Sequence, residues 1–154
     1  MESPLHDADT VVAQIRGAFS DLPRVARKSL VYMGSWETED LLRNLAKVQD
    51  TPTDQFVEWH ADSLPVFTPE GLRHVLPYYM EYTLRHPRSE AAERLIFHLA
   101  PAETGDDYWS RRLDVFSAEQ KAAICALLKF LQRELVGEHY DSYFARARVV
   151  WACI

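Results

Sequence analysis

The sequence predicts an all-α protein, a single compact domain of about six or seven helices that spans residues 1–154. Three observations predict this class. Apolar residues recur at helical spacing along most of the chain, strand-like alternation is scarce, and only five glycines interrupt the pattern. With 154 residues, of which 47% are hydrophobic and 26% charged, the chain has the composition of a globular protein and is long enough to bury a core.

The amino-terminal third predicts three helices. A first helix is expected over residues 9–20, because apolar residues fall on one side of it and Pro23 follows its end. Thr38 is expected to cap a second helix, since acidic residues follow it in the first turn. A short helix is expected around residues 56–59.

The middle of the chain has the clearest helix start. Thr68 is a good N-cap and Pro69 suits the first helical position, so a long helix is expected from there. Pro77 falls inside its apolar pattern and predicts a kink or a break just before it. Ser89 then caps a helix that extends to Ala100.

The carboxy-terminal third predicts the strongest helix. A short turn is expected around residues 106–113. Ser117 and Gln120 have the spacing of a capping box, which places a helix over residues 118–136. A final helix is expected over residues 141–151. No repeat, low-complexity tract or Gly/Ser linker divides the chain.

Charge and apolar content exclude several classes of function. Seventeen Lys and Arg against 23 Asp and Glu leave a net charge of −6, and the basic residues are scattered, so we expect no nucleic-acid partner. No apolar run is long enough to span a bilayer, and residues 1–7 lack the pattern of a signal peptide. Cys125 and Cys153 have no metal or redox spacing and suggest no disulfide framework. We therefore expect a cytoplasmic protein that contacts no membrane.

Ionisable residues on two helices are candidates for chemistry. Glu70, His74 and Glu81 lie within one sector of the helix that begins after Thr68, and such a set could hold a divalent metal or act in acid–base catalysis. The alternative is a solvated face, in which Glu81 pairs with Arg85 one turn later. No nucleophile, phosphate-binding or dinucleotide motif is present, so no cofactor is expected.

Glu134 lies inside the apolar sector of its helix. A carboxylate there must find a partner or raise its pKa, because burial disfavours the charged form. Glu134 is therefore, with Glu81, a weak candidate for a catalytic acid. The alternatives are a structural ion pair with an arginine, or a rim position whose head reaches water.

Aromatic and acidic residues outside the apolar stripes are candidates for partner binding, because interfaces are enriched in aromatic anchors. Tyr78 falls on the polar face of its helix, and Phe97 falls opposite the inner face of the next helix. Asp106, Asp107, Tyr108 and Trp109 form a run in the expected turn, where binding residues often lie. Simple core packing of these aromatic residues is the alternative.

Residues 64–80 (LPVFTPEGLRHVLPYYM) and 116–131 (FSAEQKAAICALLKFL), taken together, resemble a family of small bacterial proteins classed only as a domain of unknown function. The likeness extends from Trp59 to about Leu131. It implies a mainly helical, cytoplasmic protein and supplies no known catalytic residue.

The sequence favours a non-enzymatic protein-binding module, of an immunity-like, antitoxin-like or adaptor kind, that covers another protein. Small size, acidic charge and the lack of a catalytic motif support this interpretation. The alternative is a small metal-assisted hydrolase that uses Glu70, His74 and Glu81. A self-associating subunit, a homo-oligomer, is a third interpretation, because an apolar helix stripe looks the same against its own chain or a second copy.

Overall fold

The computed structural model describes residues 4–153, with side chains from Asp7 onward, and residues 1–3 and 154 lie outside it. The described part is all-α. Its eight α-helices are α1 (Pro4–Ala18), α2 (Trp36–Lys47), α3 (Asp54–Trp59), α4 (Pro69–Arg85), α5 (Glu90–Leu99), α6 (Asp107–Asp114), α7 (Ala118–Glu134) and α8 (Asp141–Val150). Two short 3₁₀ helices, η1 (Arg27–Ser29) and η2 (Leu64–Val66), complete it. The expected all-α class is confirmed.

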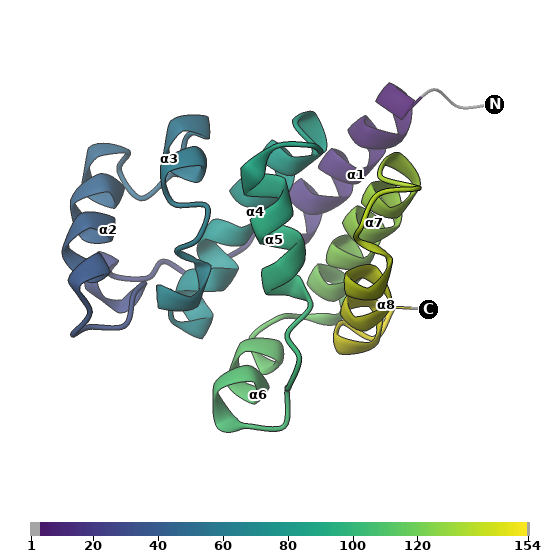
Figure 1. The fold of residues 1–154 in the computed structure, drawn as a ribbon. Coiled ribbons are helices and arrows are strands. Elements are labelled where there is room, and N and C mark those ends of the chain that lie inside the picture. Colours follow the sequence, from purple (N-terminus) through teal and green to yellow (C-terminus); the bar gives the residue numbers. More distant parts are fainter. Residues whose placement is uncertain (1–3, 154) are drawn as a thin grey trace.

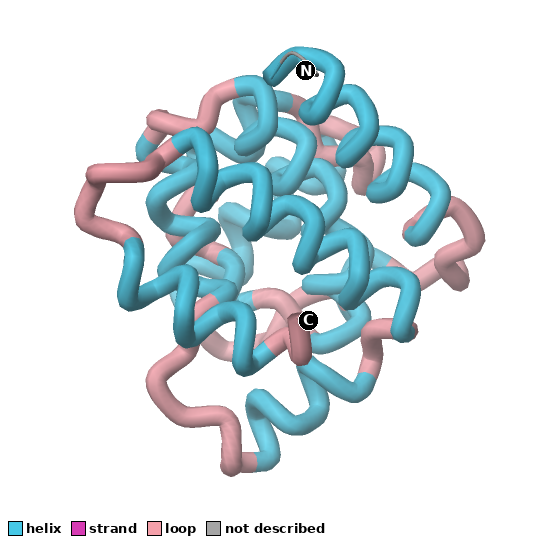
Figure 2. Tube along the Cα trace, turned by 90° about the vertical axis from the view of Figure 1, so that its right-hand side faces the viewer, coloured by secondary structure: helices cyan, strands magenta, loops and turns pink. Residues whose placement is uncertain are grey.

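Helix α4 lies at the centre of the molecule. It contacts α1, α3, α5, α6 and α7, and Figure 1 shows α2 and α3 on one side of it and α1, α7 and α8 on the other. Helix α7 packs against both α1 and α8, and Figure 2 views the molecule from the side on which these three helices lie in Figure 1. Helix α6 stands apart at the bottom of Figure 1, joined to the bundle by loops at both of its ends.

The central position of α4 follows from its sequence. Apolar residues cover so much of its circumference that ten of its residues are buried, which only an interior helix can satisfy. Thr68 caps it by accepting a hydrogen bond from the backbone N–H of Gly71, as predicted. The helix continues through Pro77 up to Arg85, so the alternative of a break at this proline is wrong.

The chain before α2 crosses the first turn of α4 at close range. A Cβ atom on Gly71 would overlap the carbonyl oxygen of Leu30, so only glycine fits at this position. Thr68 donates from its backbone N–H to the carbonyl of Leu30 (2.9 Å), and Tyr32 donates to the carbonyl of Val66 (2.8 Å). These bonds, with an isolated bridge between Val31 and Phe67, fix residues 29–32 against the start of α4.

Several predicted boundaries differ from the structure. Helix α1 begins at Pro4, five residues before the predicted start at residue 9, and ends at Ala18. Helix α2 has Ser35 as its N-cap residue. Thr38, the predicted cap, is buried in its first turn and donates a hydrogen bond to the carbonyl of Tyr32 (2.7 Å). The capping box of Ser117 and Gln120 at the start of α7 is confirmed.

The turn predicted around residues 106–113 is instead helix α6, which raises the number of described α-helices to eight. Asp106 caps it by accepting a hydrogen bond from the backbone N–H of Trp109 (3.0 Å). The helix is short and its sequence is strongly polar, so periodicity alone gave little indication of it.

Cys125 on α7 and Cys153 after α8 form a disulfide, with an S–S distance of 2.08 Å. The expectation that these cysteines form no disulfide is wrong, because α7 and α8 pack together and bring residues 28 positions apart to a Cα–Cα distance of 5.5 Å. Disulfides persist mainly in oxidising compartments. The cytoplasmic location therefore stays a prediction.

No helix within the described residues has the length and apolar character needed to cross a membrane.

Candidate functional site

Helix α6 is attached to the bundle by its polar side chains. The hydroxyl of Tyr108 donates to the carbonyl of Pro65 in η2 (2.8 Å). Arg112 reaches the same segment, and its Nη2 atom donates to the carbonyls of Leu64 (3.3 Å), Pro65 (3.0 Å) and Phe67. The short helix is thereby held opposite the start of α4 although it contributes little apolar surface.

Arg112 is the most unusual side chain of this region. It is only 1% exposed, and burial lowers the pKa of its guanidinium, although an arginine in a protein stays charged. Its guanidinium lies over the rings of Tyr108 and Trp109, at 4.4 and 5.6 Å from their centroids. None of the ion pairs among the described side chains includes Arg112. The positive charge is therefore buried without a carboxylate.

A cavity of about 280 Å³ lies between α6 and the bundle. It is partly open, and its walls are mostly apolar. Arg112 and His98 are the two basic residues that line it. The apolar and aromatic wall consists of Leu64, Pro65, Leu72, Leu76, Phe97, Leu99, Pro101, Tyr108, Trp109 and Trp151.

His98 projects from α5 into this wall. Its pKa is lowered, mainly by burial, and the charges of Arg112 and Arg94 lower it further while Asp62 opposes them. The neutral ring therefore predominates at pH 7. Its Nε2 atom is buried and has no hydrogen-bond partner, and the same holds for Nε of Arg112. Buried polar atoms without hydrogen-bond partners are rare in folded proteins. Two residues of this cavity wall carry one each, which makes the cavity a candidate binding site.

A second feature lies beside α6, on the loop between η1 and α2. Three apolar side chains are exposed here, Tyr32 (40%) and Met33 (69%) on the loop and Trp36 (83%) at the first position of α2. The ring of Tyr32 lies 6.2 Å from that of Tyr108, so the loop adjoins the outer wall of the cavity. We call these three residues the apolar loop.

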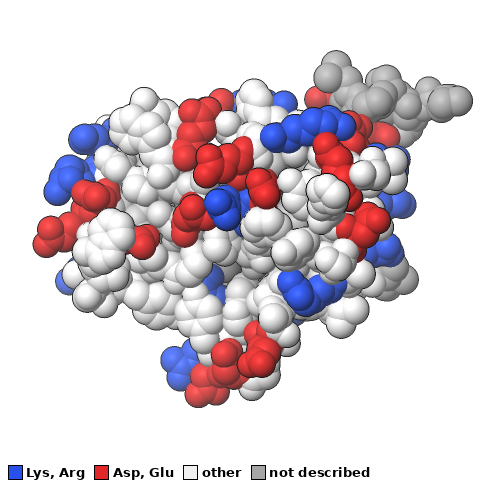
Figure 3. Space-filling model, in the orientation of Figure 1, with Lys and Arg blue, Asp and Glu red and all other residues white. Residues whose placement is uncertain are grey.

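Three of the predicted contact residues meet at the cavity. Phe97, Tyr108 and Trp109 come from α5 and α6 and line it together. Phe97 is half-buried and covered by α8, with its ring 4.6 Å from that of Tyr143, so it is not an exposed anchor. Asp106 serves as the N-cap of α6, and Asp107 is exposed in its first turn. Figure 3 shows acidic side chains gathered at the bottom of the view, where Figure 1 places α6.

Tyr78 lies elsewhere. It is half-buried in a cleft between α1 and α4, where Arg16, His74 and Glu81 also contribute to the wall. Tyr79 and Tyr82, its neighbours on α4, belong to the core. The predicted contact residues therefore do not form one surface, because Tyr78 opens to a different side of α4 from the residues near α6.

The predicted metal ligands do not converge. The carboxylate of Glu81 accepts a hydrogen bond from Nη2 of Arg16 (2.8 Å), and Nε2 of His74 bonds the backbone carbonyl of Asp50 (2.6 Å). Glu70 is exposed and lines a groove beside Tyr32. No group of three or more His, Cys, Asp or Glu residues within the described chain could hold a metal. The geometry of the described residues therefore gives no support to the alternative of a metal site at Glu70, His74 and Glu81.

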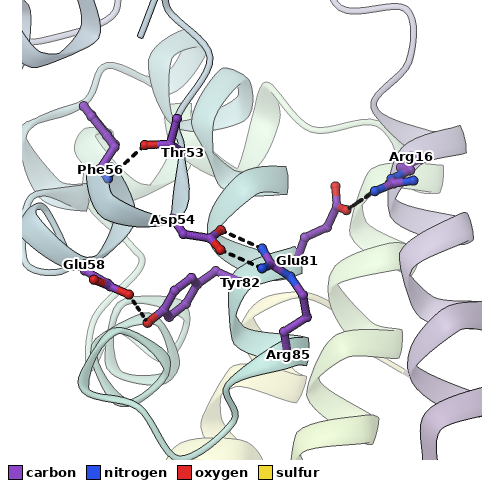
Figure 4. Close-up of polar contacts among 8 residues, drawn as sticks. All are labelled: Arg16, Thr53, Asp54, Phe56, Glu58, Glu81, Tyr82 and Arg85. Carbon is purple, nitrogen blue, oxygen red and sulfur yellow. Dashed lines mark hydrogen bonds and ion pairs between the residues drawn. The ribbon is translucent and has the colours of Figure 1, made fainter. Parts of the chain in front are cut away.

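The expected pair of Glu81 with Arg85 is also replaced by longer-range contacts. Figure 4 shows Glu81 pointing to Arg16 on α1 and Arg85 pointing to Asp54 on α3. Both guanidinium Nη atoms of Arg85 donate to the carboxylate of Asp54 at 2.7 Å, and these bonds hold the pKa of Asp54 below its usual value. Side chains on the polar face of α4 thus link this central helix to α1 and to α3.

Glu134 is half-buried at the end of α7. Its backbone carbonyl accepts a hydrogen bond from Nη2 of Arg88 (2.8 Å). This position corresponds to the predicted rim alternative, and Glu134 does not line the cavity beneath α6.

The sequence reasoning missed the residues that make this region unusual. Arg112 was one of several scattered arginines, and His98 was one of six dispersed histidines. Arg112 lies four residues after Tyr108 and three after Trp109, and Leu113 lies four residues after Trp109. If residues 107–114 are taken as a helix, these side chains are neighbours on its surface, which would have drawn attention to Arg112. The exposure of Met33 and Trp36 has no sequence indication, because apolar residues of a short loop usually pack inward.

The comparisons with known proteins identify a family and nothing closer. The model of a family of unknown function, DUF6714, matches residues 7–152. No curated protein and no solved structure shows a significant match to this chain. The match covers nearly the full sequence and extends well beyond the segments that carried the resemblance. The chain therefore belongs to the DUF6714 family.

Proposed function

We propose that this chain is a non-enzymatic protein-binding module that holds a basic partner protein through the apolar loop. The observation that carries the proposal is the exposure of Tyr32, Met33 and Trp36 within five residues of sequence. Exposed aromatic residues and methionine are the residue types that interfaces favour as anchors. A lone exposed apolar residue is ordinary, but three within five residues of sequence are unusual.

The backbone of the apolar loop is fixed before any partner arrives. Hydrogen bonds from Tyr32 to the carbonyl of Val66 and from Thr38 to the carbonyl of Tyr32 hold both ends of the turn. Gly71 allows Leu30, which comes just before the apolar loop, to pack directly on α4. A pre-ordered loop loses less conformational entropy on binding, so exposed anchors on it are well suited to recognition.

Charge near the apolar loop favours a basic partner. Glu37 and Glu39 follow Trp36 in the first turn of α2, and Glu70 and Asp114 border the groove beside Tyr32. Arg111 also borders this groove, so acids outnumber bases there. The net charge of −6 acts in the same direction over longer distances. Such complementarity speeds encounter and weakens with salt.

The test compares bait proteins in a quantitative pull-down from the source organism. The double variant Met33→Ser/Trp36→Ala removes the two most exposed side chains of the apolar loop. Val136→Ala/Val149→Ala is the matched control, since it changes two similarly exposed residues, one after α7 and one on α8. We expect one basic protein to be enriched at least tenfold by the wild type and the control and to be lost with the loop variant. Equal capture by all three baits, or no specific protein at all, contradicts the proposal.

The remaining interpretations predict different results. A self-associating subunit predicts a mass that rises with concentration in sedimentation and falls in the loop variant. The metal-assisted hydrolase has lost its structural basis, because His74 and Glu81 bond to other parts of the chain.

A further inference from the structure

The buried charge of Arg112 lacks a counter-ion. Its Nη2 atom donates to three uncharged backbone carbonyls, and its one side-chain hydrogen-bond partner is the neutral phenol of Tyr108. Its Nε atom is buried without a partner. A buried charge is costly unless it is paired. An anion that enters the cavity would supply the missing negative charge beside Arg112.

The walls of the cavity describe the rest of such a ligand. Phe97, Trp109 and Trp151 present aromatic surface, and several aliphatic side chains complete the lining. Ligand sites of this kind are mostly apolar, with a few polar groups that fix orientation. The volume of about 280 Å³ lies near the lower end of the range for ligand cavities, which limits the occupant to a small molecule.

The number of donors decides between anions. Among the residues that line the cavity, Arg112 alone carries a fixed charge, and His98 and Trp109 each add a side-chain ring with nitrogen. A phosphate group carries up to two charges and needs several donors, whereas a carboxylate carries one charge and is matched by a single guanidinium. Asp62, which faces His98, is paired with Arg94 (Nε to Oδ1, 3.2 Å), so it does not compete for Arg112.

We propose that the cavity beneath α6 binds a small organic carboxylate with an apolar or aromatic body, whose carboxylate lies against Arg112 and whose body packs on Phe97, Trp109 and Trp151. His98 lies in the same wall and offers its free Nε2 to the ligand. This site adjoins the apolar loop, but none of the loop's three residues lines it, and it does not depend on the proposed protein binding.

The first experiment titrates the full chain with 3-phenylpropionate and with its uncharged analogue, 3-phenylpropanamide, by isothermal titration calorimetry. Propionate tests the carboxylate without the aromatic body. We expect one molecule of 3-phenylpropionate per chain, with a Kd at least tenfold lower than that of either comparison compound. Equal binding of the amide would show an apolar cavity without charge recognition, and no binding of 3-phenylpropionate would overturn the proposal outright.

The second experiment uses two neighbouring arginines. Arg112→Met removes the buried charge, and Arg111→Met removes an exposed charge from the same helix that does not line the cavity. We expect the first to weaken binding of 3-phenylpropionate at least tenfold and the second to leave it unchanged. Should Arg112→Met fail to fold, as judged by circular dichroism, His98→Leu keeps every bond of Arg112 and is expected to weaken binding of the carboxylate at least threefold. Undiminished binding in a folded Arg112→Met, or failing that in His98→Leu, contradicts the role of these residues.

The two proposals fail separately. The variant Met33→Ser/Trp36→Ala retains the cavity, so it is expected to bind 3-phenylpropionate like the wild type even if it loses every protein partner.

Discussion

The α carbon of Gly71 faces the carbonyl oxygen of Leu30 so closely that no side chain fits between them. Leu30 is fully buried, and its carbonyl also accepts the hydrogen bond from the backbone of Thr68. This contact connects the first turn of α4 with the segment of chain that leads into the apolar loop. The position of the proposed binding surface thus depends on the absence of one Cβ atom.

We expect Gly71→Ala to lower the free energy of unfolding by about 1–3 kcal/mol, because the new methyl group meets backbone that no rotamer change can move. Gly17→Ala on α1 is the control, since nothing lies within 4 Å of its added Cβ atom and alanine is the better helix former. That substitution is expected to stabilise the protein by about 0.4–1 kcal/mol. Urea unfolding measures both, and equal stability of the two variants would contradict the close contact.

The disulfide between Cys125 and Cys153 links α7 to the end of the chain and closes a loop of 28 residues. By loop-closure entropy, a cross-link of this length contributes about 3–4 kcal/mol to stability. We expect reduction, or the pair Cys125→Ser/Cys153→Ser, to lower the free energy of unfolding by this amount. Thiol titration of protein purified from the source organism under acid quench tells whether the bond exists there. Two free thiols would favour the cytoplasmic location, and none would favour an oxidising compartment.

The N-cap of α7 is expected to matter more than that of α2. The hydroxyl of Ser117 accepts a hydrogen bond from the backbone N–H of Gln120 (3.1 Å), and the side-chain oxygen of Gln120 accepts one from the backbone N–H of Ser117 (2.9 Å). Ser35 makes no such bond to its helix and contacts only the hydroxyl of Thr38 (3.0 Å). Ser117→Ala should therefore cost about 1 kcal/mol and Ser35→Ala a few tenths. Thermal unfolding compares the two, and a larger loss from Ser35→Ala would reverse the assignment of caps.

The features that the sequence predicted well are local ones. The caps at Thr68, Ser89 and Ser117 depend on hydrogen bonds within four residues, and each of them forms as expected. Such features need no knowledge of what packs against them, so one sequence suffices to predict them.

The features that the sequence did not predict depend on packing between distant segments. Arg112 is buried because η2, 45 to 48 residues earlier, offers three carbonyls to it. The disulfide forms because α7 and α8 pack together. Glu81 turns to Arg16, 65 residues away, instead of to its helical neighbour Arg85. Only the three-dimensional arrangement supplies these partners, and the candidate site consists almost entirely of them.

The stability of the fold is expected to depend on pH through two histidines. His60 is 8% exposed and bonded to Asn44, and His98 lines the cavity. Burial lowers the pKa of both below the usual 6.5, so below about pH 6.5 the unfolded chain binds more protons than the folded chain. Stability is therefore present in full above that pH and is lost as the pH falls through the folded pKa values.

Urea unfolding between pH 7.5 and 5 measures this dependence. Each histidine can contribute a slope of at most about 1.4 kcal/mol per pH unit within this window. His98→Gln should reduce the slope, because it removes one of the two groups whose pKa is lowered by burial. Saturating 3-phenylpropionate is expected to reduce the slope in the wild type as well, because a carboxylate beside His98 favours its protonated form. A slope that is equally steep in wild type and in His98→Gln, with and without the carboxylate, would place the titrating group elsewhere and remove His98 from the site.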